Sequence, residues 1–179
     1  MMDSTRYELM EVEDLGSVKK EIGQLRNEVW KVMDAQSDMG WEEMDESSNA
    51  RHWIVRERGE GGEKIVAAAR LTMHHDLQGD DYRDIKLWRD KGIELQAPVV
   101  DFGRLVVKDG HKRQGLGLAL TMIRVEAAKV WGARTGVSTV SSTSVDFLKR
   151  LGFREIGATA VFVDRPNITF VALQIDFHT

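Results

Sequence analysis

The sequence predicts a single α/β or α+β domain in which helices cover both faces of a mixed sheet. Two long segments, 15–32 and 115–131, repeat apolar residues at the three- and four-residue spacing of an amphipathic helix. Short apolar or alternating segments of strand length surround them, some joined by tight turns and some separated by a helix. Hairpins together with strand–helix–strand crossovers require both antiparallel and parallel neighbours in one sheet.

The first half of the chain begins with an alternating strand and continues into the first long helix. Asp14 is suited to cap that helix, because its side chain can accept a hydrogen bond from an early backbone N–H group. The glycines of 59–63 supply the positive φ angles that a tight reversal needs. The expected order is a strand at 6–12, a helix at 15–32, an acidic loop at 33–49, and a hairpin of strands 51–58 and 64–73.

The second half contains more strands than helices. Tyr82, Ile85 and Trp88 recur at three-residue spacing, which indicates a short surface helix within 79–95. The second long helix carries one apolar face, made of Leu116, Leu120, Ile123, Ala127 and Val130. The other expected elements are a strand at 99–107, a strand at 137–140, a short helix at 144–151, and a final strand pair at 153–163 and 168–177.

Composition and charge restrict the class of protein. The chain has 179 residues, no cysteine, and a net charge of 25 − 29 = −4. We therefore expect a single domain over 1–179, without disulfides or thiolate zinc sites. The acidic balance disfavours nucleic acid as a partner, and no apolar run reaches the ~18 residues of a membrane span. The N-terminal residues do not have the layout of a signal peptide, so the expected location is the cytoplasm.

A basic, glycine-bearing loop opens the second long helix. His111, Lys112 and Arg113 cluster positive charge there, and Gly115 and Gly117 follow. The first turn of a helix presents unpaired N–H groups, and glycines let a phosphate approach them closely. These features predict an anion site, most economically for a pyrophosphate; the alternative is a solvated basic turn.

Two common phosphate loops do not match this segment. A nucleotide P-loop requires Gly-x-x-x-x-Gly-Lys-Ser/Thr, which is missing, and Leu120 stands where a dinucleotide fingerprint requires its third glycine. The run 112–117, Lys-Arg-Gln-Gly-Leu-Gly, instead resembles the signature of the GNAT superfamily of acyl-CoA-dependent N-acyltransferases, Arg/Gln-x-x-Gly-x-Gly/Ala at a helix start. Lys112 replaces the usual first Arg or Gln. The run 147–153, Phe-Leu-Lys-Arg-Leu-Gly-Phe, is similar to the family's aromatic-Tyr-Glu-Lys-Leu-Gly-Phe segment.

The resemblance covers nearly the whole chain and is most specific from 99 to 153. It implies a mostly antiparallel, splayed sheet in which acetyl-CoA threads between the strand at 99–107 and the strand at 137–140. The pantetheine arm would pair with the first of these strands as an added strand does. The cofactor-binding residues it implies are Leu105, Val106, Val107, Lys112, Arg113, Gln114, Gly115, Leu116, Gly117, Leu118, Ser142 and Phe147.

Aminolysis of a thioester requires a neutral amine, a group that removes its proton, and support for the oxyanion. Asp101 is the candidate base, because it stands eleven residues before Lys112, where some family members keep a carboxylate, usually Glu. Its alternative role is a buried ion pair with Arg70 or Arg104. Alternation places Arg104 on the opposite face from Asp101, unless a bulge changes the register. Arg104 would hold an acidic acceptor or the acyl carbonyl if it faces the cleft, and would otherwise pair with Asp or Glu.

Two positions depart from the family pattern. Ser141 stands where the family often has an Asn, and Leu148 stands where a Tyr protonates the departing sulfur. Leucine cannot donate a proton, so the catalytic site expected here consists of Asp101, Arg104 and Ser141. Ser141, Ser142 or Thr143 would hydrogen-bond the pantetheine arm, and water would protonate the thiolate. The resemblance further places the acceptor site at the first helix and the loop after it. The contact residues it implies are Trp30, Met33, Trp41 and Arg70.

The sequence thus predicts an N-acyltransferase that moves acetyl from acetyl-CoA directly to a primary amine of a small molecule, without a metal. One alternative is a longer-chain N-acyltransferase, because Asp101 and Arg104 resemble the acidic-x-x-Arg strand of acyl-homoserine lactone synthases. The other is a non-catalytic acyl-CoA-binding module, which Leu148 and Ser141 favour. The apolar final strands are compatible with a homodimer.

Overall fold

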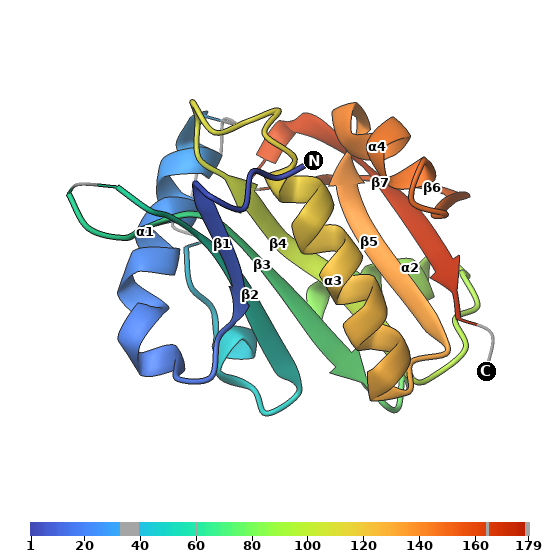
Figure 1. Cartoon of the computed structure of the whole chain (residues 1–179). Helices are drawn as coiled ribbons and strands as arrows, with labels where there is room; N and C mark the ends of the chain where they lie inside the picture. Colours follow the sequence, from blue (N-terminus) through green and yellow to red (C-terminus); the bar gives the residue numbers. More distant parts are fainter. Residues whose placement is uncertain (33–39, 60, 164, 178–179) are drawn as a thin grey trace. The chain divides into compact units, whose positions relative to one another are not determined.

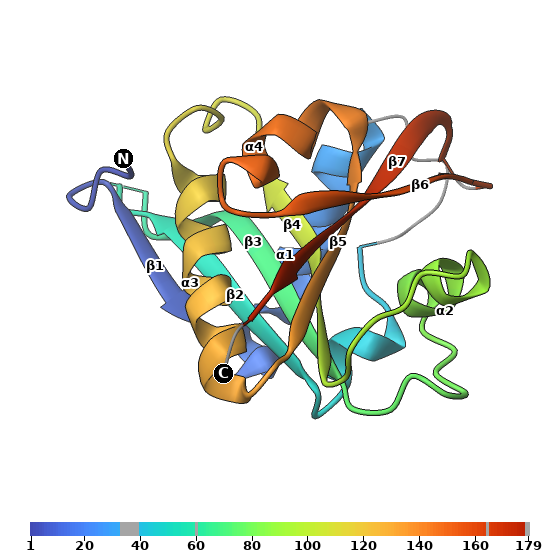
Figure 2. The same cartoon turned by 90° about the vertical axis from the view of Figure 1, so that its right-hand side faces the viewer.

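The structure is a computed structural model, which describes residues 1–32, 40–59, 61–163 and 165–177 (Figure 1; Figure 2 gives a second view). It contains seven strands, four α-helices and two 3₁₀ helices within this part of the chain. In chain order they are β1 (Tyr7–Glu11), α1 (Leu15–Val32), η1 (Glu43–Glu46), β2 (Ala50–Glu57), β3 (Lys64–His74), α2 (Arg83–Asp90), β4 (Val99–Val107), α3 (Leu116–Trp131), β5 (Thr135–Ser141), η2 (Ser142–Ser144), α4 (Val145–Lys149), β6 (Arg154–Phe162) and β7 (Arg165–Asp176).

The strands form one sheet in the order β1-β2-β3-β4-β5-β7-β6. The pairs β1–β2, β5–β7 and β6–β7 are antiparallel, whereas β4–β5 is parallel. The parallel pair is connected through α3, because parallel neighbours need a crossover rather than a hairpin. The predicted fold class, a mixed and mostly antiparallel sheet with helices, is confirmed.

The chain divides into two compact units. The first comprises Met1–Arg70 and Arg104–Arg124, and the second comprises Leu71–Gly103 and Val125–Thr179. The elements β3, β4 and α3 each run from one unit into the other. Each unit has its own hydrophobic cluster, so the two are described separately below.

The core of the first unit forms around the apolar stripe of α1. Val18, Ile22, Leu25 and Val29 are buried in one cluster, as their helical spacing predicts. The cluster also takes in residues of β2, β3 and β4, namely Ile54, Ile65, Ala68 and Val106. The predicted helix at 15–32 therefore agrees with α1 in both its bounds and its buried face.

The core of the second unit includes α2, which the sequence predicted only as a surface helix. Ile85 and Trp88 are fully buried, and Ile85 clusters with Val99 of β4 and Val137 of β5. The Trp88 indole Nε1 donates a hydrogen bond of 2.7 Å to Thr139 Oγ1. This bond satisfies the polar atom of a buried ring. The sequence prediction placed this helix at the surface because a three-residue spacing over one short helix does not reveal how deeply its apolar face is buried.

The buried face of α3 differs from the predicted stripe after its second turn. Ile123 and Val130 are 38% and 87% exposed, whereas Arg124 is only 1% exposed. The Arg124 guanidinium donates to Leu120 O at 3.0 Å and to Arg70 O at 2.9 Å. A buried cation is tolerated here because backbone carbonyls accept its hydrogen bonds. Hydropathy alone ranks isoleucine above arginine and therefore chose the wrong face.

Candidate active site

The loop before α3 has the backbone geometry of an anion cradle. Gly110, Arg113 and Gly115 all have positive φ angles, of 84°, 62° and 79°. The N–H of Ala119 bonds Gly115 O at 3.0 Å, which is the first i→i−4 bond of the helix. The N–H groups of 116–118 therefore have no intrahelical acceptor, as expected of a first helical turn. The loop, the helix start and the strand end that precede it all belong to the first unit.

Gly117 faces the end of β4 in this unit. A Cβ atom added at Gly117 would lie 3.9 Å from Val107 Cγ2 and 4.0 Å from Leu105 Cδ2, which are ordinary van der Waals distances. The structure thus brings three of the predicted cofactor-binding residues together. A residue as small as alanine would fit at position 117, whereas a larger side chain would extend into the space beside the strand.

Gly115 has much less room. Its φ is 79°, and an added Cβ atom would lie 2.9 Å from Met2 N. The backbone of Met1 and Met2 therefore packs directly beside the predicted pyrophosphate loop. Glycine is required at this position both for its backbone conformation and for this close approach.

The cationic side chains of the loop do not share one environment. Lys112 and Arg113 are exposed, with Lys112 Nζ 3.4 Å from Asp109 Oδ1. His111 instead turns inward: its Nδ1 lies 3.1 Å from Tyr7 Oη, and its Nε2 lies 3.7 Å from Glu57 Oε2. The expectation that His111 adds charge at the same spot as Lys112 and Arg113 is not supported by these contacts.

A buried network of arginines and carboxylates occupies another part of the first unit. Asp45 Oδ1 accepts hydrogen bonds from Arg26 Nη1 and Arg70 Nη1, both at 2.9 Å. Glu42 continues the network, since its Oε1 lies 2.8 Å from Arg70 Nη1 and its Oε2 pairs with Arg104 Nη2. Arg26, Arg70 and Asp45 are almost completely buried, while the Glu42 side chain is 34% exposed. We call this group the arginine–carboxylate cluster.

Burial and charge act in opposite directions on the cluster's carboxyl groups. Burial alone would raise the pKa of Asp45, but the guanidinium groups of Arg26 and Arg70 outweigh it and the pKa is lowered. The pKa of Glu42 is lowered in the same way, by Arg104 and Arg70 against its burial. Burial lowers the pKa of Arg26 to about 10, so Arg26 remains protonated near neutral pH. In the described part of the chain, these contacts therefore join three guanidinium groups to two carboxylates.

Aromatic rings lie against this cluster. Arg104 Cζ lies 5.0 Å from the centroid of the Trp30 ring, and Arg26 Cζ lies 5.4 Å from that of the Trp41 ring. Trp41 also stacks on His52, at 5.8 Å between ring centroids. Burial lowers the pKa of His52 to about 4, so this imidazole is neutral near pH 7 and adds no charge. Cations over indole rings are favourable contacts that desolvation strengthens.

The structure thus brings together four residues that the sequence singled out, Trp30, Trp41, Arg70 and Arg104. Met33, the remaining predicted acceptor contact, lies outside the described residues. Arg104 has a φ of 56°, so the backbone of β4 departs from regular strand geometry at this residue. The sequence analysis named such an irregularity as the condition under which Arg104 would leave its expected face. Its guanidinium contacts Glu42 and Trp30, so the alternation of side chains between the two faces of a regular strand does not describe its position.

The sequence analysis missed Arg26, Glu42, Asp45 and His52, which complete the cluster. A signal for Arg26 was present, because it lies four residues after Ile22 and four before Trp30, on the buried face of α1. No comparable signal exists for the two carboxylates, since they stand in an unperiodic acidic loop. In the structure, η1 carries Asp45 inward, and the Glu42 N–H donates to Asp45 Oδ2 at 3.0 Å.

Asp101 lies in the second unit, at the point where β4 stops pairing with β5. The parallel pairing covers Val99–Asp101 of β4 and ends with Asp101 opposite Val137. One residue further on, Ser138 Oγ donates to Phe102 O at 3.1 Å. A side-chain hydrogen bond thus follows the last backbone pairing between β4 and β5. This local end of pairing is what a splayed sheet requires at the fork between two strands.

The Asp101 carboxylate is buried, with 1% of the residue exposed, and accepts a hydrogen bond of 3.3 Å from Tyr82 Oη. The Tyr82 ring stacks on His74, at 5.0 Å between centroids. His74 is 4% exposed, and its Nδ1 lies 2.6 Å from Asp80 Oδ2. The fork therefore has a polar and aromatic wall that the sequence did not indicate. Whether Asp101 acts as a base or as an ion-pair partner stays a prediction.

The remaining predicted residues lie at the end of β5 and just after it, in the same unit. Ser141 Oγ lies 2.9 Å from Thr143 Oγ1, and Ser142 begins η2. Phe147 is half-buried in α4, whereas Leu148, at the family's tyrosine position, is 4% exposed. Leu148 is thus part of the core of this unit, and its side chain cannot act as an acid.

No group of three or more His, Asp or Glu side chains among the described residues is arranged to hold a metal ion. Within the same part of the chain, no helix is both long and apolar enough to cross a membrane.

Comparison with known proteins places this fold and these motifs in a family. The family model described as N-acyl amino acid synthase FeeM matches residues 21–176. The chain belongs to the FeeM family. No curated protein sequence matches it significantly.

Solved structures similar to this FeeM-family chain share its fold at low sequence identity. FeeM itself, an N-acyl amino acid synthase from uncultured soil microbes, aligns with a TM-score of 0.70 and 11% identity, over 96% of this chain and 92% of that one. An acyl-CoA N-acyltransferase from Pseudomonas aeruginosa gives 0.68 and 18%, over 94% and 99%. Arabidopsis thaliana NAA60, solved in complex with acetyl-CoA, gives 0.69 and 10%, over 96% and 98%.

The resemblance to the GNAT superfamily is therefore confirmed. This FeeM-family chain is an N-acyltransferase, as the sequence predicted, and it shares the fold of solved N-acyltransferases.

Proposed function

We propose that this chain acylates the amino group of a free amino acid with an acyl group from coenzyme A. The observation that carries the proposal is the gathering of three guanidinium groups around two carboxylates in the arginine–carboxylate cluster, next to Trp30 and Trp41. An amino acid has a carboxylate that guanidinium groups attract, whereas a simple amine has none. The description of the matching family, N-acyl amino acid synthase, supports the same acceptor class.

For the donor, we propose that coenzyme A binds at the start of α3 and along the end of β4. The N–H groups of 116–118 and the exposed Lys112 and Arg113 would hold the pyrophosphate. The pantetheine arm would lie along Leu105–Val107, beside Gly117, with Ser142 and Phe147 as further contacts. The absence of a side chain at Gly117 and its distances to Val107 and Leu105 support this route.

In the reaction, the neutral amine would attack the thioester carbonyl, and the thiolate of coenzyme A would leave. We assign Asp101 the removal of the amine's proton, directly or through a water, because it is a buried carboxylate at the fork of β4 and β5. Arg104 would orient the acceptor carboxylate or the acyl carbonyl, and Ser141 would hydrogen-bond the pantetheine arm. Since the Leu148 side chain has no acidic proton to donate, water would protonate the thiolate.

Acetyl is the acyl group that the sequence analysis expects, and a longer chain is the second candidate. The description shared by the family and its structural relative FeeM, N-acyl amino acid synthase, is compatible with either acyl group. A thiol-release assay separates the two if acetyl-CoA, hexanoyl-CoA and decanoyl-CoA are compared with the same pool of amino acids.

The acceptor proposal is tested by removing the acceptor's charge while keeping its amine. Each amino acid that is turned over is compared with its amide, which has the same side chain and amino group but no carboxylate. We expect kcat/KM to fall by about tenfold or more for the amide, the loss of one charge-assisted contact. Equal rates for acid and amide would refute the carboxylate-binding role of the cluster. Acyl-CoA binding without turnover of any amine would favour the non-catalytic alternative.

A further inference from the structure

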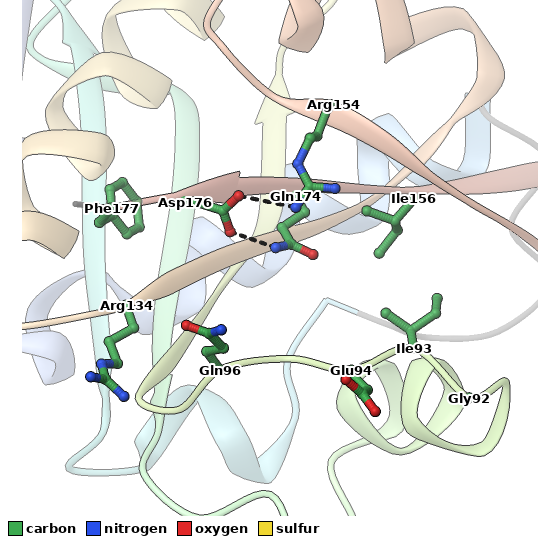
Figure 3. Close-up of a pocket in the computed structure, with 10 residues that line it drawn as sticks. All are labelled: Gly92, Ile93, Glu94, Gln96, Arg134, Arg154, Ile156, Gln174, Asp176 and Phe177. Atoms are coloured by element: carbon green, nitrogen blue, oxygen red, sulfur yellow. Dashed lines mark hydrogen bonds and ion pairs between the residues drawn. The ribbon is translucent and has the colours of Figure 1, made fainter.

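A cavity of about 780 Å³ lies in the second unit, lined by residues that none of the proposed site groups includes (Figure 3). Its lining comes from the 92–96 loop before β4, from Arg134 just before β5, from the start of β6 and from the end of β7. We call it the β6–β7 cavity. Its volume is within the range of about 300–1,000 Å³ that small-molecule sites occupy.

One end of the cavity is apolar. Ile93 from the loop and Ile156 from β6 extend toward one another there, and both are half-buried (Figure 3). Two facing aliphatic side chains that remain partly exposed gain free energy when an alkyl group fills the space between them. This end therefore favours an aliphatic group.

The middle of the cavity carries amide groups. Gln96 rises from the loop, and Gln174 of β7 lies opposite it (Figure 3). Gln174 Nε2 donates to Asp176 Oδ1 at 2.5 Å, whereas the Gln96 side chain makes no hydrogen bond within the described residues. Its amide can therefore both donate to and accept from a ligand's amide.

The far end of the cavity provides a cation. Arg154 Nη2 lies 3.0 Å from Asp176 Oδ2, so these two charges compensate each other. In the described part of the chain, the Arg134 guanidinium forms no ion pair or side-chain hydrogen bond. It can hold a carboxylate bidentately. The exposed Glu94 lies beside Ile93, at the other end of the cavity (Figure 3), where it would repel a second negative charge on the ligand and so favours a monoanion.

We propose that the β6–β7 cavity binds a small N-acyl amino acid. Along the cavity, the facing isoleucines, the glutamine amides and Arg134 match the alkyl group, the amide and the carboxylate of such a molecule, in that order. This inference rests on the proposed function in one respect. If that function holds, the ligand is a product of the chain's own reaction, and it binds at a second site. Binding itself requires no turnover.

Calorimetric titration with N-hexanoylglycine tests the inference without any enzymatic assay. We expect binding at concentrations up to ~1 mM, about tenfold weaker binding of hexanoylglycinamide, which lacks the charge, and weaker binding of N-acetylglycine, which lacks the alkyl chain. Hexanoate, which has no amide, should also bind less tightly. Equal affinities for N-hexanoylglycine and hexanoylglycinamide, or no heat from N-hexanoylglycine, would overturn the proposal.

Variants and NMR locate the site. Arg134→Gln should weaken N-hexanoylglycine binding by about tenfold, whereas Arg150→Gln, which changes an exposed arginine of the same unit outside the cavity, should leave it within about twofold. Amide shifts should concentrate at 92–96, 154–156 and 174–177. Shifts confined to 112–118 would show that the ligand occupies the acyl-donor site and would overturn the inference. If acyl transfer fails while these shifts appear, the cavity assignment stands and the proposed function falls.

Discussion

The arginine–carboxylate cluster makes its sharpest prediction at Asp45. Asp45→Asn keeps the shape of the side chain but removes the charge that compensates Arg26 and Arg70, both of which contact Oδ1 at 2.9 Å. Asp45 is 1% exposed and both arginines are 0% exposed, so water cannot replace the lost carboxylate. Breaking a buried ion pair by removing one partner costs about 3–5 kcal/mol, and we expect the free energy of unfolding to fall by that amount.

The measurement is urea unfolding at pH 7, with midpoint and slope fitted separately. Glu43→Gln is the matched control, because Glu43 is an exposed residue of the same η1 turn, and it should change the free energy of unfolding by less than about 0.5 kcal/mol. A loss for Asp45→Asn of under about 1 kcal/mol, equal to that of the control, would refute the view that Asp45 compensates two buried cations.

The pH dependence follows from the same carboxyl group. The folded-state pKa of Asp45 is lowered, so its contribution to stability is complete above the unfolded-state pKa of about 3.9 and is lost as the pH falls through the folded-state value. The wild-type chain should therefore lose stability below about pH 4, and Asp45→Asn should lose less over that interval. Parallel acid unfolding curves for the two proteins would contradict this assignment.

Three further predictions concern the acyl-transfer site. Gly117→Trp should abolish coenzyme A binding in calorimetry. Gly117→Ala should retain it, because a Cβ atom there meets Val107 only at 3.9 Å. Equal affinities for both variants would exclude this position from the cofactor site. Gly115→Ala should lower the free energy of unfolding by about 1–2 kcal/mol, since its φ is 79° and its Cβ would lie 2.9 Å from Met2 N, and urea unfolding checks this. Asp101→Asn should lower kcat without changing coenzyme A affinity and should flatten the acid limb of the pH–rate profile; an unchanged profile would assign Asp101 a structural role.

Much of the architecture was predictable because it depends on local patterns. The apolar stripe of α1 repeats over 18 residues, so its bounds and buried face followed from periodicity. The β2–β3 hairpin and the β6–β7 pair followed from strand-length runs around turn residues. The loop before α3 was recognisable because its glycines and the helix start lie within a few residues of one another. A local signal of this kind needs no knowledge of distant partners.

The sequence by itself determined the order of elements, the phosphate-loop pattern, and the superfamily resemblance that the family match confirmed. Only the tertiary structure decided which polar residues became buried. Arg26, Arg70 and Arg124 are buried because carboxylates or carbonyls from residues distant in the chain accept their hydrogen bonds. Hydropathy assigns every arginine to the surface, since the free energy of burying a charge depends on partners that appear only after folding.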